Sequence, residues 1–173
     1  MKLKGIYRTV LILLVLVITV GGDQATKSMM RAHIHPYDRY FFFKGHVTLL
    51  NVQNTGAFLS LGDKLPNPYH FILLTLLPVV ALLGGLLYII LKNNFTLTAL
   101  LGIVFVIGGG MGNLYDRIVY GSVTDFVHIQ YGRFQTGVFN LADIFIMVGV
   151  GLLLLDAVLK SSRSRRKPVS EAV

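Results

Sequence analysis

Hydrophobic residues gather into four long stretches of the chain, separated by more polar links. They cover about residues 6–22, 69–91, 95–115 and 139–159. A helix needs about 20 apolar residues to cross a bilayer core of about 30 Å. Three stretches reach that length, and the first reaches it if Tyr7, Arg8 and Gly21-Gly22 lie at the membrane interfaces. The pattern predicts an all-α polytopic membrane protein with four transmembrane helices.

The link between the first two stretches contains a different pattern. Its segment at about 39–61 is rich in Phe, Val, Thr and Leu and is broken by Gly45, Asn51 and Gly56. Such a segment predicts two or three short strands, and hence a small β-element beside the helices. The run Phe41-Phe42-Phe43 fits two interpretations equally well, contact with the lipid interface or a small core.

The first apolar stretch also resembles a signal peptide, because basic residues precede it and small residues follow it. The polar motif Asp23-Gln24-Ala25-Thr26-Lys27 comes directly afterwards. This motif favours a retained transmembrane helix over a cleaved leader.

Basic residues predict the orientation of the helices. Nine of the sixteen lie on short segments of one side, namely Lys2, Lys4, Arg8, Lys92, Lys160, Arg163, Arg165, Arg166 and Lys167. Short cytoplasmic segments are enriched in Lys and Arg. We therefore expect both termini to be cytoplasmic, the β-region to be extracytoplasmic, and the basic tail 160–173 to lie near anionic lipid. Residues 1–173 are expected to form a single membrane domain.

Composition narrows the possible chemistry. The chain is 54% hydrophobic with a mean hydropathy of +0.67, which is too apolar for an ordinary soluble domain. The net charge of +8 does not indicate a nucleic-acid binder, because zinc-finger spacing, an RNP-like strand and a basic helix are missing from the sequence. The absence of cysteine excludes disulfides and thiolate catalysis. Seven of the eight acidic residues are Asp, so carboxylate chemistry must use Asp.

Two polar motifs occur between the first two apolar stretches. Asp23 and Lys27 are four residues apart and share a face if the helix continues, which predicts at least an interfacial salt bridge. Asn54 and Gly56 lie in Asn51-Val52-Gln53-Asn54-Thr55-Gly56-Ala57-Phe58. On its own this second motif indicates a turn, although Gly56 would also permit close approach of another chain.

A third motif ends the third apolar stretch. Gly108 and Gly112 form a small-xxx-small pattern that is typical of close helix packing, or that leaves room for a substrate backbone. Asn113, Asp116 and Arg117 follow. For Asp116 and Arg117, an ion pair or a cap that orders the helix end is favoured over direct catalysis.

Asp125 and Asp143 lie beside apolar segments, in Val123-Thr124-Asp125-Phe126 and Phe139-Asn140-Leu141-Ala142-Asp143. A carboxylate at membrane depth costs roughly 2.5–3.5 kcal/mol, so it is a functional candidate. A pair suggests chemistry in which one carboxylate is ionised and the other protonated. The alternative for each is a helix cap or an ion pair with Arg117. His-Glu-x-x-His and Gly-x-Ser-x-Gly are absent, so zincin and serine-hydrolase sites are unsupported.

Taken in order, five motifs resemble those of the lipoprotein signal peptidase family, also called signal peptidase II. They are Asp23-Gln24-Ala25-Thr26-Lys27, Asn54-Thr55-Gly56-Ala57-Phe58, Gly112-Asn113-Leu114-Tyr115-Asp116-Arg117, Gly121-Ser122-Val123-Thr124-Asp125-Phe126 and Phe139-Asn140-Leu141-Ala142-Asp143. Each motif is weak alone, but five in this order across four spans are specific. Two departures occur: Gln53 replaces a usual basic residue, and Gly56-Ala57-Phe58-Leu59 replaces Gly-Ala-Ala-Phe.

The resemblance implies an aspartic intramembrane protease of the bacterial cytoplasmic (inner) membrane, with its active site toward the extracytoplasmic face. Its substrates would be prolipoproteins, cut just before a cysteine that carries diacylglycerol, without a metal or cofactor. The resemblance assigns catalysis to Asp125 and Asp143. It implies supporting or substrate-binding roles for Asp23, Lys27, Asn54, Gly56, Gly108, Gly112, Asn113, Asp116, Arg117 and Asn140. Expected partners are prolipoproteins and membrane lipids, and the chain is expected to be a monomer.

Two rival functions keep the same residues but change their role. In a proton-coupled transporter, Asp125, Asp143 and Arg117 would line a path through the bundle. The polar motifs gather at one membrane face, which argues against such a path. A catalytically silent relative would bind lipoprotein precursors without cutting them, and the intact Asp pair argues against it.

Overall fold

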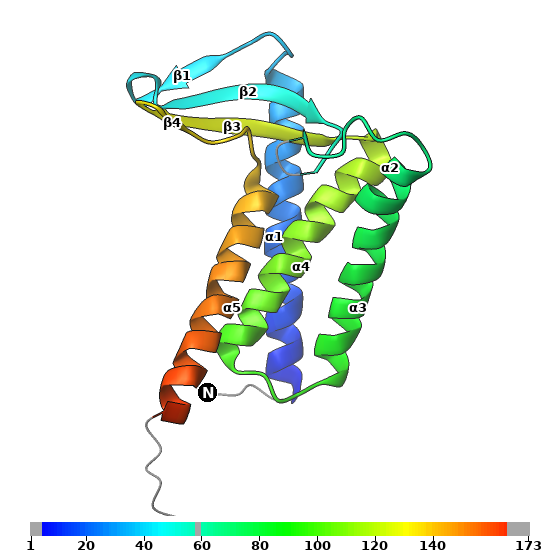
Figure 1. Cartoon of the computed structure of the whole chain (residues 1–173), viewed down its shortest axis with the longest axis vertical. Coiled ribbons are helices and arrows are strands. Elements are labelled where there is room, and N and C mark those ends of the chain that lie inside the picture. The colour runs from blue at the N-terminus through cyan, green and yellow to red at the C-terminus, as the bar shows by residue number, and fades with distance from the viewer. Residues whose placement is uncertain (1–4, 58–59, 166–173) are drawn as a thin grey trace, which may run out of the picture.

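The computed structural model describes residues 5–57 and 60–165, with side chains as far as residue 162. Phe58 and Leu59, Lys2 and Lys4, and Arg166 and Lys167 of the basic tail therefore lie outside the described residues. Four helices long and apolar enough to cross a membrane run side by side, and a β-sheet lies across one end of the bundle (Figure 1). The prediction of four membrane-spanning helices with a small β-element is confirmed.

The second span, Tyr69–Leu91, has the predicted bounds, whereas the other three helices differ in length from the predicted stretches. Helix α1 covers Gly5–His33, α4 covers Leu97–Tyr120 and α5 covers Leu141–Arg165. The second span, Tyr69–Leu91, consists of α2 (Tyr69–Phe71), a π-helical turn (Ile72–Leu76) and α3 (Leu77–Leu91). The wide turn precedes Pro78, which has no N–H to donate to a carbonyl one helical turn earlier.

The sheet has four antiparallel strands in the order β1-β2-β3-β4. Strands β1 (Tyr40–Phe42) and β2 (Val47–Asn54) confirm the strands predicted within 39–61. Strands β3 (Val123–Tyr131) and β4 (Phe134–Gln135) come from the link after α4 and extend the β-element beyond its predicted range. The sheet therefore joins two links that are far apart in sequence.

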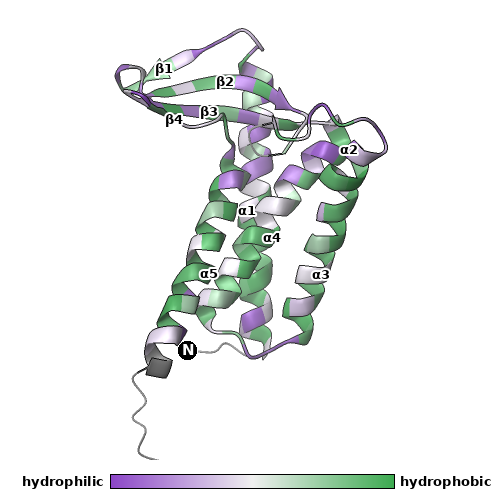
Figure 2. Ribbon diagram, in the orientation of Figure 1, coloured by the Kyte–Doolittle hydropathy of each residue, from purple (hydrophilic) through white to green (hydrophobic). Residues whose placement is uncertain are grey.

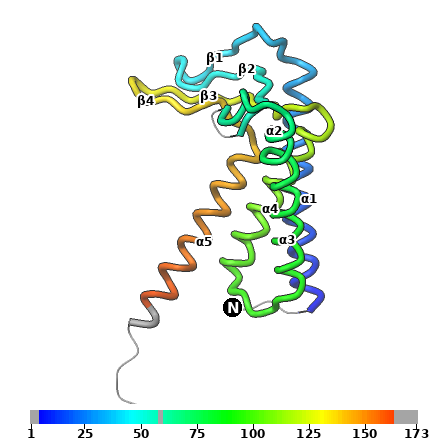
Figure 3. The backbone as a smooth tube through the Cα atoms, turned by 45° about the vertical axis from the view of Figure 1, so that its right-hand side comes forward, coloured from blue at the N-terminus to red at the C-terminus, as the bar shows by residue number. Residues whose placement is uncertain are grey.

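Helix α4 is the centre of the bundle, because it contacts the other three spans. In the half of the bundle away from the sheet, the buried residues that fill the interior are Ile12, Ile89, Leu100, Val104 and Ile107. Figure 2 shows apolar residues over most of the helices and polar residues gathered where the helices meet the sheet. Helix α5 packs on α4 along its length, where Gly149 lies beside Gly102 and Thr96 donates a hydrogen bond to Asp156. Further from the sheet, α5 leans away from α1 and α3 (Figure 3).

Both described ends of the chain lie at the end of the bundle opposite the sheet (Figures 1 and 3). At this end, the guanidinium of Arg8 donates hydrogen bonds to the carbonyls of Ile89 and Lys92 at the C-terminus of α3. Positive charge is favoured there because the last carbonyls of a helix lack intrahelical donors.

The aromatic run at the start of the sheet does not form a small core. Phe41, Phe42 and Phe43 are all exposed, because β1 is the edge strand and packs on β2 alone within the sheet. Of the two interpretations of this run, the structure excludes the core.

Candidate active site

Helix α1 carries the first part of the site beyond the depth of the bilayer core. With 29 residues, it is ~43 Å long at 1.5 Å per residue, so its last turns reach the sheet. Asp23 and Lys27 lie one turn apart there, and Lys27 Nζ is 2.8 Å from Asp23 Oδ2. Both side chains are fully buried, so the predicted salt bridge is confirmed but is internal rather than interfacial.

Asp116 of α4 joins the same buried cluster. Its Oδ2 lies 3.5 Å from Lys27 Nζ and 3.5 Å from Arg31, and accepts a hydrogen bond from the Thr124 amide at 2.9 Å. The expected pairing of Asp116 with Arg117 is therefore corrected. Adjacent residues on a helix point in different directions, and Asp116 points toward α1 while Arg117 points toward the β2 end.

Asn113, one turn before Asp116, connects this cluster to Asp143. Its Oδ1 accepts hydrogen bonds from Lys27 Nζ at 2.8 Å and from Asn140 Nδ2 at 3.0 Å. With its oxygen held by two donors, the amide nitrogen is directed to Asp143 Oδ1, at 2.8 Å. A buried lysine thus determines which way the Asn113 amide faces.

Asn140 and Asp143 form the N-terminal cap of α5. The Asp143 amide donates to Asn140 Oδ1 at 3.0 Å, and the Asn140 amide donates to Asp143 Oδ2 at 3.1 Å. This reciprocal pattern is a capping box, so the predicted helix-cap role is confirmed. Asn140 also reaches the sheet, because its Nδ2 donates to Asp125 Oδ1 at 2.6 Å.

Asp125 lies on β3, opposite Val52 of β2. Its second oxygen accepts a hydrogen bond from Asn54 Nδ2 at 2.9 Å, and the residue is only 4% exposed. Burial raises the pKa of Asp125 to about 6 because a carboxylate loses its hydration there. The hydrogen bonds from Asn54 and Asn140 oppose this shift in the pKa, and the nearby charge of Asp143 adds to it.

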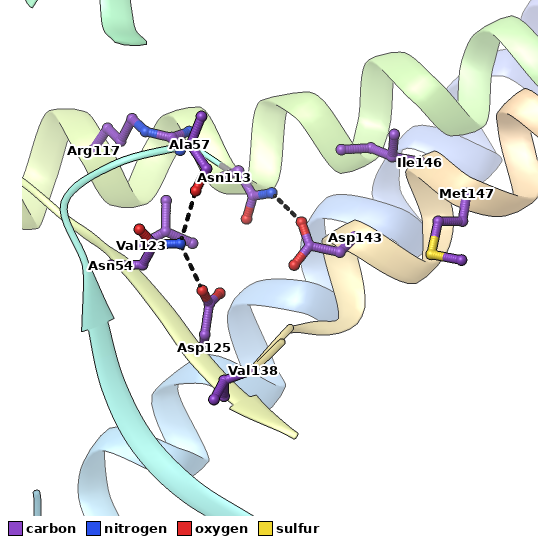
Figure 4. A pocket seen from close by; sticks show the side chains of 10 residues that line it. All are labelled: Asn54, Ala57, Asn113, Arg117, Val123, Asp125, Val138, Asp143, Ile146 and Met147. Atoms are coloured by element: carbon purple, nitrogen blue, oxygen red, sulfur yellow. Dashed lines mark hydrogen bonds between the residues drawn. The ribbon is translucent and has the colours of Figure 1, made fainter. Parts of the chain in front are cut away.

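Asp125 and Asp143 line one pocket of about 250 Å³ (Figure 4). They are eighteen residues apart in sequence but meet because the chain returns from β3 to α5, where Phe139 pairs with Val127. The other residues that line the pocket are Asn54, Ala57, Asn113, Arg117, Val123, Val138, Ile146 and Met147. The pocket is therefore apolar over much of its wall, with two carboxylates, two amides and one guanidinium facing it.

Arg117 lines the pocket near the end of β2 and is bonded there to Gly56. Arg117 Nη2 donates to the Gly56 carbonyl at 2.9 Å, and the Gly56 amide donates to Asn54 Oδ1 at 3.0 Å. A Cβ on Gly56 would lie 2.5 Å from the backbone of Ser60, so a side chain has no room there. The motif is thus a turn, as its pattern indicates, and also holds Asn54 toward Asp125. Among the described residues, Arg117 Nε is buried without a hydrogen-bond partner.

Gly108 and Gly112 do not face the pocket. A Cβ on Gly108 would overlap the Thr19 side chain of α1, and one on Gly112 would lie 2.5 Å from Asp23 Oδ2. The small-xxx-small pattern therefore serves close packing of α1 on α4, which brings Asp23 and Lys27 to the site.

The sequence analysis missed three further residues of the cluster, Gln24, Arg31 and Thr124. Gln24 donates to the Gly112 carbonyl and to Asp116, while Arg31 donates to Thr124 Oγ1 at 3.0 Å. Arg31 follows Lys27 by four residues and Asp23 by eight. That spacing would have indicated Arg31 had the first helix been extended past Gly22. Nowhere in residues 5–57 and 60–165 do three or more His, Cys, Asp or Glu gather in a way that could hold a metal ion.

Four apolar spans and a pocket of carboxylates and amides at one end define a polytopic membrane protein with a polar site where the bundle meets the sheet. The chain belongs to the signal peptidase (SPase) II family, whose model matches residues 13–159. This confirms the resemblance drawn from the five motifs and makes the chain a member of a membrane protease family.

Curated relatives and a solved structure agree with this membership. A lipoprotein signal peptidase of Ectopseudomonas mendocina (strain ymp) is 33% identical over 156 residues, which cover 90% of this chain and 91% of that protein. One of Aquifex aeolicus (strain VF5) is 36% identical over 104 residues, 60% of this chain and 61% of that protein. A solved bacterial membrane enzyme, 23% identical, superposes with a TM-score of 0.81 over 98% of this chain and 99% of that one, which shows the same fold.

Proposed function

We propose that this chain is an aspartic endopeptidase of the bacterial cytoplasmic membrane that removes signal peptides from prolipoproteins. The bond cut would be the one just before the cysteine that carries diacylglycerol. Family membership supports the lipoprotein substrate. The observation that carries the aspartic mechanism is the pair Asp125 and Asp143, which face one pocket and both accept hydrogen bonds from Asn140.

In the proposed reaction the two carboxylates share one proton and activate a water molecule. The ionised carboxylate takes a proton from the water, which attacks the scissile carbonyl carbon. The protonated carboxylate donates its proton to the carbonyl oxygen. The tetrahedral intermediate then collapses: the first carboxyl passes its proton to the leaving nitrogen, and the second carboxylate takes a proton from a hydroxyl of the intermediate as the new carbonyl forms. The pair therefore again holds one proton.

We assign the starting proton to Asp125. A pKa raised to about 6 leaves a fraction of this carboxyl protonated near neutral pH, and a bound substrate that displaces water would raise the pKa further. Asp143 would then start ionised, stabilised by hydrogen bonds from the side chain of Asn113 and the backbone of Asn140.

Arg117 and Asn54 are proposed to hold the substrate backbone. Both side chains line the pocket beside Asp125 and Asp143, where the guanidinium of Arg117 and the amide of Asn54 could bond to a substrate backbone.

The lipid on the substrate cysteine would lie against α5. Met147 lines the pocket and is also 71% exposed on a membrane-spanning helix, so the pocket adjoins the lipid-facing surface. Acyl chains could remain in the bilayer while the adjacent peptide bond reaches Asp125 and Asp143. This placement supports a requirement for the diacylglyceryl group.

The arrangement favours the protease over the transporter. The polar cluster occupies one end of the bundle, and the buried side chains Ile12, Leu100, Val104 and Ile107 fill the other half. A transport path for ions would need polar groups to continue through that half. We propose that the sheet end, with the pocket, faces the extracytoplasmic side, that both termini are cytoplasmic, and that the chain acts as one membrane domain.

The substrate assignment is tested by a gel-shift cleavage assay with the purified full-length chain in nanodiscs. Two matched precursors would be compared, one prolipoprotein with diacylglycerol on its cysteine and the same protein without it. We expect cleavage of the lipidated form and little or none of the other. Equal cleavage of both would contradict the lipid requirement, and binding of the lipidated form without cleavage would identify a silent relative.

A further inference from the structure

The sheet ends in two adjacent turns that project sideways beyond the helices. We call them the hairpin tips; they are residues 43–46, between β1 and β2, and residues 131–134, from the end of β3 to the start of β4. The two tips lie together, because the His46 and Tyr131 rings are 4.8 Å apart and the Gln130 amide donates to the His46 carbonyl at 2.8 Å. Figures 1 and 3 show this edge of the sheet extending past the bundle on the α5 side.

Each tip pairs an exposed aromatic ring with an exposed cation. Phe43 is 78% exposed beside Lys44, and Phe134 is 84% exposed beside Arg133. Aromatic rings favour the boundary between headgroups and acyl chains, and nearby Lys and Arg are attracted to anionic lipid. The repetition of this pair on two turns that meet in space is unlike the scattered apolar residues of an ordinary protein surface.

The backbone of the first tip is strained at these same positions. Phe43 has φ of 51° and Lys44 has φ of 58°, in the left-handed region that suits Gly or Asn. For other residues this conformation is unfavourable, because Cβ crowds the following carbonyl oxygen. The exposed Phe43 ring gains little from packing inside the protein to offset this cost. A contact outside the protein would account for a bulky ring and a cation at these positions.

We propose that the hairpin tips form a membrane-anchoring surface that binds the anionic headgroup layer of the bilayer beside α5. The occupant is a lipid surface because the tips overhang helices whose outer faces lie in lipid, and because their cations complement anionic headgroups. The proposal needs only that the four helices span the membrane and goes beyond the proposed peptidase activity.

Anchoring of the hairpin tips would affect the pocket, because β2 and β3 connect the tips to it. Strand β2 begins near one tip and ends at Asn54, and β3 begins near Asp125 and ends at the other tip. The distance between Asp125 and Tyr131 along β3 is roughly 20 Å at 3.3 Å per residue. Fixing the tips on the membrane surface would therefore set the tilt of the two strands over the pocket.

Tryptophan fluorescence tests the proposal without depending on cleavage, because the chain contains no Trp. Phe134→Trp would be reconstituted in vesicles that contain anionic lipid, with bromine atoms placed at different acyl depths. We expect blue-shifted emission and the strongest quenching by bromine nearest the headgroups. The matched control is Tyr37→Trp, since Tyr37 is 95% exposed on the link between α1 and β1, away from the bundle. Equal emission and quenching in the two variants would overturn the proposal.

The contribution of charge is tested on the same probe. Adding Lys44→Gln and Arg133→Gln should lower quenching by about twofold in anionic vesicles and leave it unchanged in neutral ones. Unchanged quenching in anionic vesicles would overturn the assignment to anionic headgroups. Phe43→Trp provides a second probe should Phe134→Trp fail to fold.

Discussion

At the scale of single residues, Asp125 is strongly buried, and its hydrogen bonds replace only part of the hydration that its carboxylate loses. Two side-chain amides donate to its oxygens, yet its pKa is raised to about 6 from an ordinary value of 3.8. Neutral amide donors therefore offset only part of the hydration that the carboxylate loses. The unfolded chain would release this proton near pH 3.8, whereas the folded chain keeps it until about pH 6.

This difference predicts how Asp125→Asn changes stability with pH. Below pH 3.8 the carboxyl is protonated in both states, so its stabilising contribution is fully present there. As pH rises through the folded pKa of about 6, wild type loses that contribution and the variant does not. The difference in the free energy of unfolding, variant minus wild type, should therefore rise by about 3 kcal/mol between pH 3 and pH 8.

Reversible unfolding in mixed micelles at several pH values measures this change. Asp63→Asn is a suitable control, because Asp63 is exposed and its replacement should leave the pH dependence unchanged. A constant difference between Asp125→Asn and wild type across this pH range would show that Asp125 ionises normally.

Asn140 serves both carboxylates, and its two roles can be separated. Asn140→Ser keeps a side-chain oxygen for the cap of α5 but is too short to donate to Asp125. We expect near-normal thermal stability with kcat lowered by roughly 10²-fold, because Asp125 loses one of its two side-chain donors. Asn140→Ala should lose the cap as well and be less stable by about 1 kcal/mol. Normal kcat in the serine variant would limit Asn140 to a capping role.

At the scale of elements, the sequence predicted the helices better than it predicted their ends. The first span was predicted to stop at Gly22, but α1 continues to His33. Hydropathy alone gives no reason for a membrane helix to extend through Asp23 and Lys27. The partners that make this extension stable, Asp116 and Asn113, come from α4 and were not predictable as contacts of α1.

The sheet was also predicted only in part. Strands β1 and β2 were predicted from their composition, whereas β3 was missed although residues 127–131 alternate apolar and polar side chains. The five motifs indicated Asp125, Asp143 and Asn140, but not the order of contacts among them. That order depends on the register of β3 against β2 and on the return of the chain to α5.

The close contact between α1 and α4 predicts that Gly108→Ala destabilises the fold. The new methyl group would overlap Thr19 and push α1 away, so we expect a loss of about 1–3 kcal/mol in stability. Gly84→Ala in α3 is the matched control, because a Cβ there has no atom within 4 Å and the change should be neutral or slightly stabilising. Unfolding curves of the two variants in one detergent measure the difference. Equal stabilities would contradict close packing at Gly108.

At the scale of the whole molecule, the buried polar cluster and the aliphatic core occupy different halves of the bundle, with Arg8 and Asp156 buried at the far end of that core. Buried Asp23, Lys27 and Asp116 lie beneath the sheet, and the aliphatic core fills the half near the described chain ends. Two separate links of the chain close over the polar half as one sheet. The resulting site can receive water from one membrane face while its side wall adjoins lipid.

The proposed orientation predicts which residues are accessible from outside the cell. The chain has no cysteine, so single-cysteine variants report one position each. A cysteine at Tyr37, near the sheet, should react with a membrane-impermeant maleimide in spheroplasts. A cysteine at Asn93, in the exposed link between α3 and α4, should react only after the membrane is permeabilised. The opposite pattern would reverse the assignment of the active-site face.

The central claim is that Asp125 and Asp143 act together on the scissile bond. The most direct measurement is single-turnover cleavage of a lipidated prolipoprotein by wild type, Asp125→Asn and Asp143→Asn, with Asp63→Asn as the control and thermal unfolding to verify folding. We predict that each of the first two variants loses roughly 10²–10⁴-fold or more in rate, while the control cleaves normally. Cleavage at the wild-type rate by a folded Asp125→Asn or Asp143→Asn variant would contradict the two-aspartate mechanism.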